Sequence, residues 1–218
     1  MPNTSSNFPD GTAPRVIEIA LAEVGTIEEG ENLTKYGKFT GFDGLPWCGS
    51  FVNWCFSEAG VRLPSMVSTA IGANKLKDMG RFTDSPQLGD LAFMDFPHDG
   101  VDRISHIGIV IGVHGHSIIT IEGNTSGSGD QRNGGMVMIK QRHFGEDKEI
   151  VGFGRPKFVA YKGKYASWAR SFLAAALAVY MTGNQDLKSI AMGGIAAVLP
   201  VVIRWLNPQD SAFGRLGE

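Results

Sequence analysis

The stretch SHIGIVIGVHGHSIITIEGN, residues 105–124, decides the fold class. It holds two short runs rich in Ile and Val, Ser105–Gly112 and Ser117–Glu122, with glycine between them. Short β-branched runs bounded by turn-forming residues are typical of strands. Segments of the same kind lie at Asp90–Phe96, Gly135–Arg142 and Phe158–Tyr161. We therefore predict an antiparallel sheet for the part of the chain that follows Pro86.

The residues before Pro86 have a helical pattern instead. Apolar residues at helical spacing predict helices over Pro14–Gly25, from Trp47 or Cys48 to Gly60, and over Thr69–Met79. The polar, Gly-rich stretch Thr26–Leu45 predicts a loop. Helices followed by strands indicate an α+β domain, in which a helical layer packs on a small antiparallel sheet and the domain ends near Lys162.

The composition excludes several classes of protein. The chain has 218 residues and a net charge of -2, which leaves no basic surplus for neutralising phosphates, so nucleic acid is not an expected partner. The two cysteines, Cys48 and Cys55, are about 10 Å apart if the segment is helical, which is too far for a disulfide. Neither belongs to a C-x-x-C pair, so no structural zinc site is expected and a reducing compartment is compatible.

The two ends of the chain differ from the middle. Residues 1–11 are rich in Pro, Asn and Ser, lack a secretory signal and predict a flexible arm before a domain at 12–162. Residues 163–218 hold two uncharged apolar stretches, Ser171–Gln185 and Ser189–Ile203, which predict a hairpin of two helices. Each would be about 22 Å long, against about 30 Å of bilayer hydrocarbon. Trp and Arg flank both stretches as at membrane interfaces, so membrane contact and protein packing through residues 166–206 both stay open.

Cys48 stands where a helix is expected to begin. Backbone N–H groups and the helix dipole favour a thiolate at that position, and a thiolate is the form that attacks a carbonyl. A buried cysteine is more commonly a small hydrophobic residue, and that interpretation is kept for Cys55.

A thiolate nucleophile needs a base, and His106 is the best placed of the five histidines. Strand alternation puts His106 on one face with Gly108, which leaves room beside the imidazole. The next strand ends in Glu122-Gly123-Asn124, and either Glu122 or Asn124 could orient the ring if the two strands pair as a hairpin. Each signal also has an ordinary structural interpretation, as a satisfied histidine and as turn formers. The remaining histidines are expected in solvent, at positions 98, 114, 116 and 143, and the pair at 114 and 116 lacks a third metal ligand.

In combination, these signals resemble the CHAP family of cysteine- and histidine-dependent amidohydrolases and peptidases, which are papain-like peptidoglycan hydrolases. The resemblance spans about Pro14–Lys162. It depends on PWCGSFV at 46–52, LGDLAF at 88–93, HIGIV at 106–110 and IEGN at 121–124. It implies a papain-like α+β fold with Cys48 as nucleophile, His106 as base, and Glu122 and Asn124 as polar partners. It also implies that Gly89 and Asp90 turn the chain into the sheet. Some members bind calcium on an acidic loop before the cysteine, but the loop here offers Asp43 and no cluster of Asp residues, so no metal or cofactor is expected.

The resemblance implies cleavage of an amide bond in bacterial cell-wall peptidoglycan, between sugar and stem peptide or within the peptide. The C-terminal region is weakly similar to the hairpin of small holins, which suggests a phage lytic enzyme located in the host cytoplasm, at the inner membrane or in the virion. Two alternatives stay open: a catalytically idle wall-binding or particle component, and a membrane-permeabilising protein with an accessory hydrolase domain.

Overall fold

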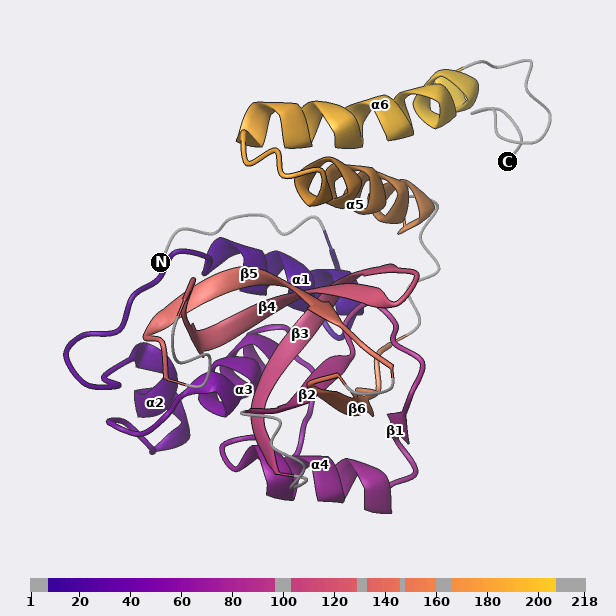
Figure 1. The fold of residues 1–218 in the computed structure, drawn as a ribbon. Helices are drawn as coiled ribbons and strands as arrows, with labels where there is room; N and C mark the ends of the chain where they lie inside the picture. Colours follow the sequence, from indigo (N-terminus) through magenta and orange to yellow (C-terminus); the bar gives the residue numbers. More distant parts are fainter. Residues whose placement is uncertain (1–7, 97–102, 129–132, 146–147, 160–165, 207–218) are drawn as a thin grey trace. The chain divides into compact units, whose positions relative to one another are not determined.

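The computed structural model describes residues 8–96, 103–128, 133–145, 148–159 and 166–206. The chain divides into two compact units, Met1–Ala160 and Tyr161–Glu218. The described part of the first unit has four helices followed by six strands. Helices come first and strands follow (Figure 1), which is the α+β order that the sequence predicts. The helices are α1 (Ala13–Ala22), α2 (Lys35–Thr40), α3 (Cys48–Glu58) and α4 (Thr69–Asp78). The strands are β1 (Phe82–Thr83), β2 (Leu91–Asp95), β3 (Ile104–His114), β4 (Ser117–Thr125), β5 (Met136–His143) and β6 (Ile150–Gly154).

The six strands form one antiparallel sheet in the order β1-β6-β2-β3-β4-β5. Strands β2 to β5 follow one another as neighbours, so the predicted hairpin of β3 and β4 is confirmed. Ile109 pairs with Ile121 in that hairpin, and His106 pairs with Met94 of β2. This register places the ends of β3 and β4 that hold His106 and Glu122 side by side.

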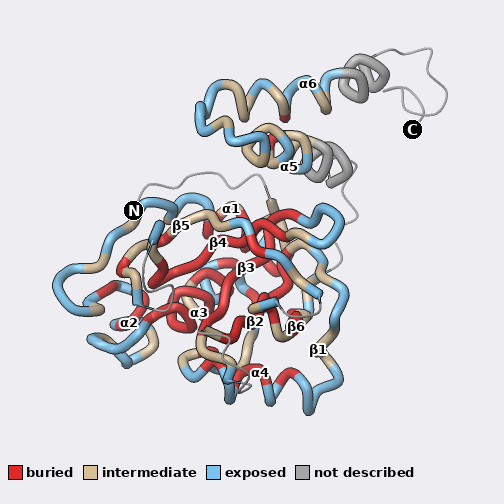
Figure 2. The backbone as a smooth tube through the Cα atoms, viewed as in Figure 1, coloured by how far each residue is buried: buried red, intermediate tan, exposed pale blue. Residues whose placement is uncertain are grey.

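Helix α3 packs on β3 and β4 and is the most buried helix of the unit (Figure 2). Glycine permits this contact, because a Cβ atom added to Gly123 of β4 would lie 2.7 Å from Cβ of Phe51 and 2.8 Å from the ring of Trp47. The close approach sets the distance between the start of α3 and the sheet.

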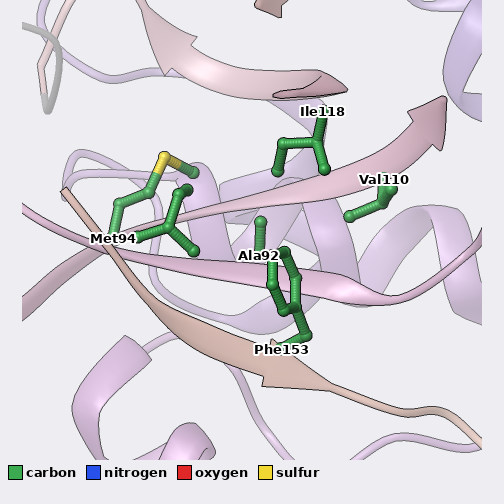
Figure 3. Packing of buried hydrophobic residues seen from close by; sticks show 6 residues of the cluster. Ala92, Met94, Val110, Ile118 and Phe153 are labelled. Atoms are coloured by element: carbon green, nitrogen blue, oxygen red, sulfur yellow. The ribbon is translucent and has the colours of Figure 1, made fainter. Parts of the chain in front are cut away.

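A group of apolar side chains from four strands packs together within the sheet (Figure 3). Ala92 and Met94 of β2 meet Val110 of β3, Ile118 of β4, and residues Ile150 and Phe153 of β6. Met94 belongs to this cluster and is the direct partner of His106, so the histidine is held beside a packed apolar region.

Four elements differ from the sequence prediction: α2, the segment Phe158–Tyr161, and the strands β1 and β6, which were not predicted. The predicted loop Thr26–Leu45 contains α2, a six-residue helix too short to show a periodic pattern; Thr34 caps its start and Gly41 ends it in the left-handed conformation. The predicted strand Phe158–Tyr161 is wrong in its described part, since residues 158 and 159 are not in a strand. The last strand that the structure describes is β6. Its two glycines interrupt the apolar pattern that predicts a strand. A Cβ atom on Gly154 would lie 2.4 Å from Cδ1 of Leu76, so close packing requires that glycine.

The second unit contains α5 (Ala166–Met181) and α6 (Leu187–Leu206), which pack on each other. A Cβ atom on Gly193 would lie 2.5 Å from Cγ2 of Val179, and one on Gly194 would lie 2.6 Å from the ring of Phe172. The two glycines therefore allow the helices to approach closely. Within the described ranges, neither these helices nor any other has the length and apolar character needed to cross a membrane.

Replacing Gly123 with alanine tests the contact between α3 and β4. The added methyl group must displace Phe51 or Trp47, so we expect Gly123→Ala to lower the free energy of unfolding by about 1–3 kcal/mol, measured by urea denaturation. Gly127→Ala is the matched control, because the nearest atom to its added Cβ is 3.9 Å away. Equal stabilities of the two variants would contradict this description of the contact.

Candidate active site

Cys48 is the first residue of α3, as the sequence predicts, and only 4% of its surface is exposed. The residue before it, Trp47, supplies no side-chain hydrogen bond to the first turn. The backbone N–H groups there are therefore not capped by that residue, and they can contribute to holding an anion beside the thiol.

Neighbouring residues hold the first turn of α3 in place. The indole of Trp47 donates a hydrogen bond to Oε2 of Glu28 at 2.7 Å and stacks on Tyr36. A Cβ atom on Gly49 would lie 1.8 Å from the carbonyl oxygen of Met66, so the helix is pressed against that loop. On the other side, the hydroxyls of Ser50 and Thr40 are 2.8 Å apart. These contacts leave Cys48 little freedom to move.

His106 lies on β3, is fully buried and packs against the ring of Phe96 with 5.8 Å between ring centroids. Its Nε2 atom is 3.1 Å from Oε2 of Glu122. Its Nδ1 atom makes no well-directed hydrogen bond within the described ranges, yet the Cys48 thiol is near enough to raise the pKa of the ring. With Nε2 held by the carboxylate, Nδ1 is the nitrogen left to exchange a proton with the thiol.

Glu122 lies on β4, is fully buried and accepts hydrogen bonds from three strands. Thr120 of the same strand donates to Oε1 at 2.6 Å. Arg142 of β5 donates from Nε to Oε1 at 2.9 Å and from Nη2 to Oε2 at 2.6 Å. Gly108 makes room for this carboxylate, since a Cβ atom there would lie 2.7 Å from Cγ of Glu122. The sequence predicts that Gly108 leaves space beside the imidazole of His106. In the structure, the side chain of Glu122 occupies that space.

The pKa values of the buried groups favour ionised forms. Burial by itself lowers the pKa of His106, but the hydrogen bonds and charges of Cys48 and Glu122 outweigh it and raise that pKa to about 9. Burial alone would raise the pKa of Glu122, whereas Arg142 and His106 bring it well below its usual range. These shifts favour a protonated imidazole beside the Glu122 carboxylate.

Asn124 does not bond to His106, in contrast to the role that the resemblance implies. Its amide nitrogen donates to Oδ1 of Asn32 and of Asn133, and its Oδ1 accepts from the backbone of Gly135. A bulge in β4 between Glu122 and Thr125 and a φ of 57° turn the residue away from the regular register. Asn124 instead joins the segment after α1 to the start of β5.

The structure also gives the positions of the other residues that were considered in the sequence. The histidines at 114, 116 and 143 are exposed as expected, and His98 lies outside the described residues. Asp43 accepts a hydrogen bond from the backbone of Thr34, and Cys55 is a fully buried free thiol. Asp90 pairs with Arg155 at 2.9 Å and caps the turn at Gln87. Within the described ranges, no three His, Cys, Asp or Glu side chains are placed to hold a metal ion.

A recess of about 460 Å³ opens between α2, α3 and the loop that follows α3. Thr40 and Val67 line it, and both adjoin the first turn of α3: Thr40 is bonded to Ser50, and a Cβ atom on Gly49 would lie 2.9 Å from the nitrogen of Val67. Arg62 contributes a positive charge to its lining. The recess is therefore mixed in polarity and adjoins the first turn of α3, but Cys48 is not among its lining residues.

Sequence reasoning missed two residues of the site, Arg142 and Thr120. Both lie on strands, where a single arginine or threonine gives no distinctive signal. Arg142 pairs with Ile118 in the ladder and is placed near Glu122 only through the register of β4 and β5. That register was not predictable from either strand alone.

Part of the chain matches the model of a described family. Residues 40–124, less than half of the chain, match the model of the CHAP domain, which confirms the resemblance for that part. All four predicted site residues lie in this range. The search of curated proteins finds no match.

Among solved structures, the chain is similar to a protein from Staphylococcus aureus subsp. aureus Mu50 that is described as similar to a lipoprotein of the NLP/P60 family. The two chains are 17% identical with a TM-score of 0.39. The alignment covers 74% of this chain and 46% of that one, so this chain spans less than half of that protein's length.

The protonation state of His106 can be measured directly. NMR titration of the ring should give a pKa of about 9 in the wild type. We expect Glu122→Gln to lower this value, because the carboxylate favours the imidazolium by a hydrogen bond and by its charge. The folded-state pKa is raised, so the stability that His106 contributes is present at low pH and is lost as the pH rises through about 9. An unchanged titration in Glu122→Gln would contradict this account.

Proposed function

We propose that this protein is a cysteine-dependent hydrolase that cleaves an amide bond of bacterial peptidoglycan. The observation that supports the proposal best is the buried sequence of contacts from Cys48 through His106 to Glu122, at the start of a helix. The CHAP match over residues 40–124 favours the amidase and peptidase class and a peptidoglycan substrate. An idle scaffold of the same fold would have no use for a buried imidazole whose Nδ1 atom is left without a well-directed hydrogen bond.

The proposed mechanism has two steps that balance protons. The Cys48 thiolate attacks the carbonyl carbon, and the backbone N–H groups at the start of α3 stabilise the resulting oxyanion. The His106 imidazolium gives its Nδ1 proton to the leaving nitrogen as the C–N bond breaks, which leaves a thioester. Water then attacks the thioester, His106 accepts a proton from it, and the C–S bond breaks to return the thiolate. Glu122 stabilises the imidazolium and holds the ring in orientation throughout.

Release of soluble fragments from purified cell walls tests the nucleophile. We expect Cys48→Ala to lower the initial rate by at least ~10³-fold, because no other group can form the thioester. Cys55→Ala is the matched control and should keep most of the activity, since that thiol is buried in the apolar side of α3. Equal clearing of walls by Cys48→Ala and the wild type would exclude the assignment.

Mass spectrometry of the released fragments identifies the bond that is cut. A new lactyl end on the sugar indicates an amidase, whereas a new peptide amine indicates an endopeptidase.

The second unit has a separate proposed role, contact with a membrane surface near the wall. Large apolar side chains of α6 are exposed, namely Leu187, Met192, Ile195 and Leu199. The proposal concerns contact with the surface, because no described helix is suited to span the bilayer. Such a contact fits the proposed locations in the host cytoplasm or at its inner membrane, although location in a phage particle stays an alternative.

Flotation of the full chain with liposomes tests this contact. We expect the double variant Ile195→Asp and Leu199→Asp to lose most of the floating fraction, because charge opposes burial of α6 in the interface. Lys188→Asp, a charge change at the first turn of the same helix, serves as a control for net charge. Unchanged flotation of the double variant, or absence of flotation in the wild type, would exclude a membrane role for these residues.

A further inference from the structure

Arg142 is a nearly buried arginine directly behind the proposed catalytic residues. Its side chain is 8% exposed, and it forms two hydrogen bonds to the carboxylate of Glu122. Its guanidinium also lies over the ring of Phe96 at 5.1 Å from the centroid. Phe96 in turn packs against His106, so Arg142 contacts both neighbours of the imidazole. A bidentate arginine in this geometry restricts the carboxylate to one orientation.

Among the residues that the structure describes, the charges of the site balance when Arg142 is counted. An active form with a Cys48 thiolate and a His106 imidazolium already contains one buried ion pair. Glu122 adds a second negative charge, which is fully buried and needs a positive partner of its own. Arg142 supplies it. Among the described residues, Lys140 of the same strand and Glu149 before β6 are charged groups near Arg142, and neither bonds to the Glu122 carboxylate.

Without Arg142 the buried set would hold three charges, two negative and one positive. The change that neutralises this set at the lowest cost in free energy keeps the close pair of His106 and Glu122 and protonates Cys48. Loss of a residue that touches neither Cys48 nor substrate would then reduce the thiolate population.

We propose that Arg142 is a positioning residue that acts through Glu122 and permits Cys48 and His106 to be ionised together at neutral pH. This inference rests on the proposed function of Cys48 and His106, but it concerns the ionisation of the thiol and is measured without peptidoglycan.

The test is the pH dependence of alkylation of the full chain by iodoacetamide, followed at Cys48 by mass spectrometry. We expect Arg142→Met to need a higher pH than the wild type to reach the same rate of alkylation. The rate at a given acidic pH should fall about tenfold for each unit by which the titration moves. Arg142→Lys keeps the charge and should retain the wild-type pH profile. A wild-type profile in Arg142→Met, or a loss of rate that is equal at every pH, would overturn the proposal.

A double variant separates the charge of Arg142 from its packing. Removing both charges in Glu122→Gln with Arg142→Met leaves one balanced pair, so reactivity at neutral pH should partly return relative to Arg142→Met alone. No recovery in the double variant would overturn the inference that Arg142 acts through Glu122.

Cys55 is an internal control for folding, because it is fully buried and its pKa is raised by burial, so it is alkylated only if the chain opens. If Arg142→Met exposes Cys55, that variant no longer tests the proposal, and the pH profile of alkylation of Arg142→Lys is compared with that of the wild type instead. A shifted profile in Arg142→Lys would overturn the proposal. Failure of the wild type to cleave walls would refute the proposed function while leaving these alkylation profiles interpretable.

Discussion

The carboxylate of Glu122 is the group on which the arrangement of the site depends. It is fully buried, and an unpaired carboxylate in that position would be strongly destabilising. Its acceptor positions are filled by His106 of β3, Thr120 of β4 and Arg142 of β5. Three adjacent strands must therefore keep one register for a single charge to be satisfied. The same constraint holds the imidazole in one orientation, so stability and proposed chemistry depend on the same hydrogen bonds.

Glycines bring the remaining parts close enough to contact this group. Gly108 leaves the space that the Glu122 side chain fills, and Gly123 allows β4 to lie directly against Trp47 and Phe51 of the α3 region. Because Gly49 has no side chain, the first turn of α3 can pack directly on the backbone of Met66. A helix start and a strand end can thus be packed within reach of each other. Larger residues at these positions would increase the distance between the thiol and its base.

Electrostatic interactions explain why the ionisable side chains of His106 and Glu122 are tolerated inside the protein. Burial opposes ionisation of His106 and of Glu122 alike, yet their mutual interaction and Arg142 outweigh it and shift each pKa toward the charged form. A thiolate at Cys48 would complete two balanced ion pairs. The proposed acyl transfer uses a thiolate beside an imidazolium, and this charge balance supports both.

By itself the sequence determined the α+β class, the helix that begins at Cys48 and the paired strands that contain His106 and Glu122, because periodicity and turn residues are local properties. The short helix α2 and the strand β6 were beyond it, since six residues show no period and the glycines of β6 make sense only against Leu76 and Phe82. The tertiary structure alone decided between the two predicted partners of His106. A one-residue bulge turns Asn124 away from the ring, and the pairing of β4 with β5 brings Arg142 to Glu122. Strand register is set by the two paired strands together, so it cannot be predicted from either strand alone.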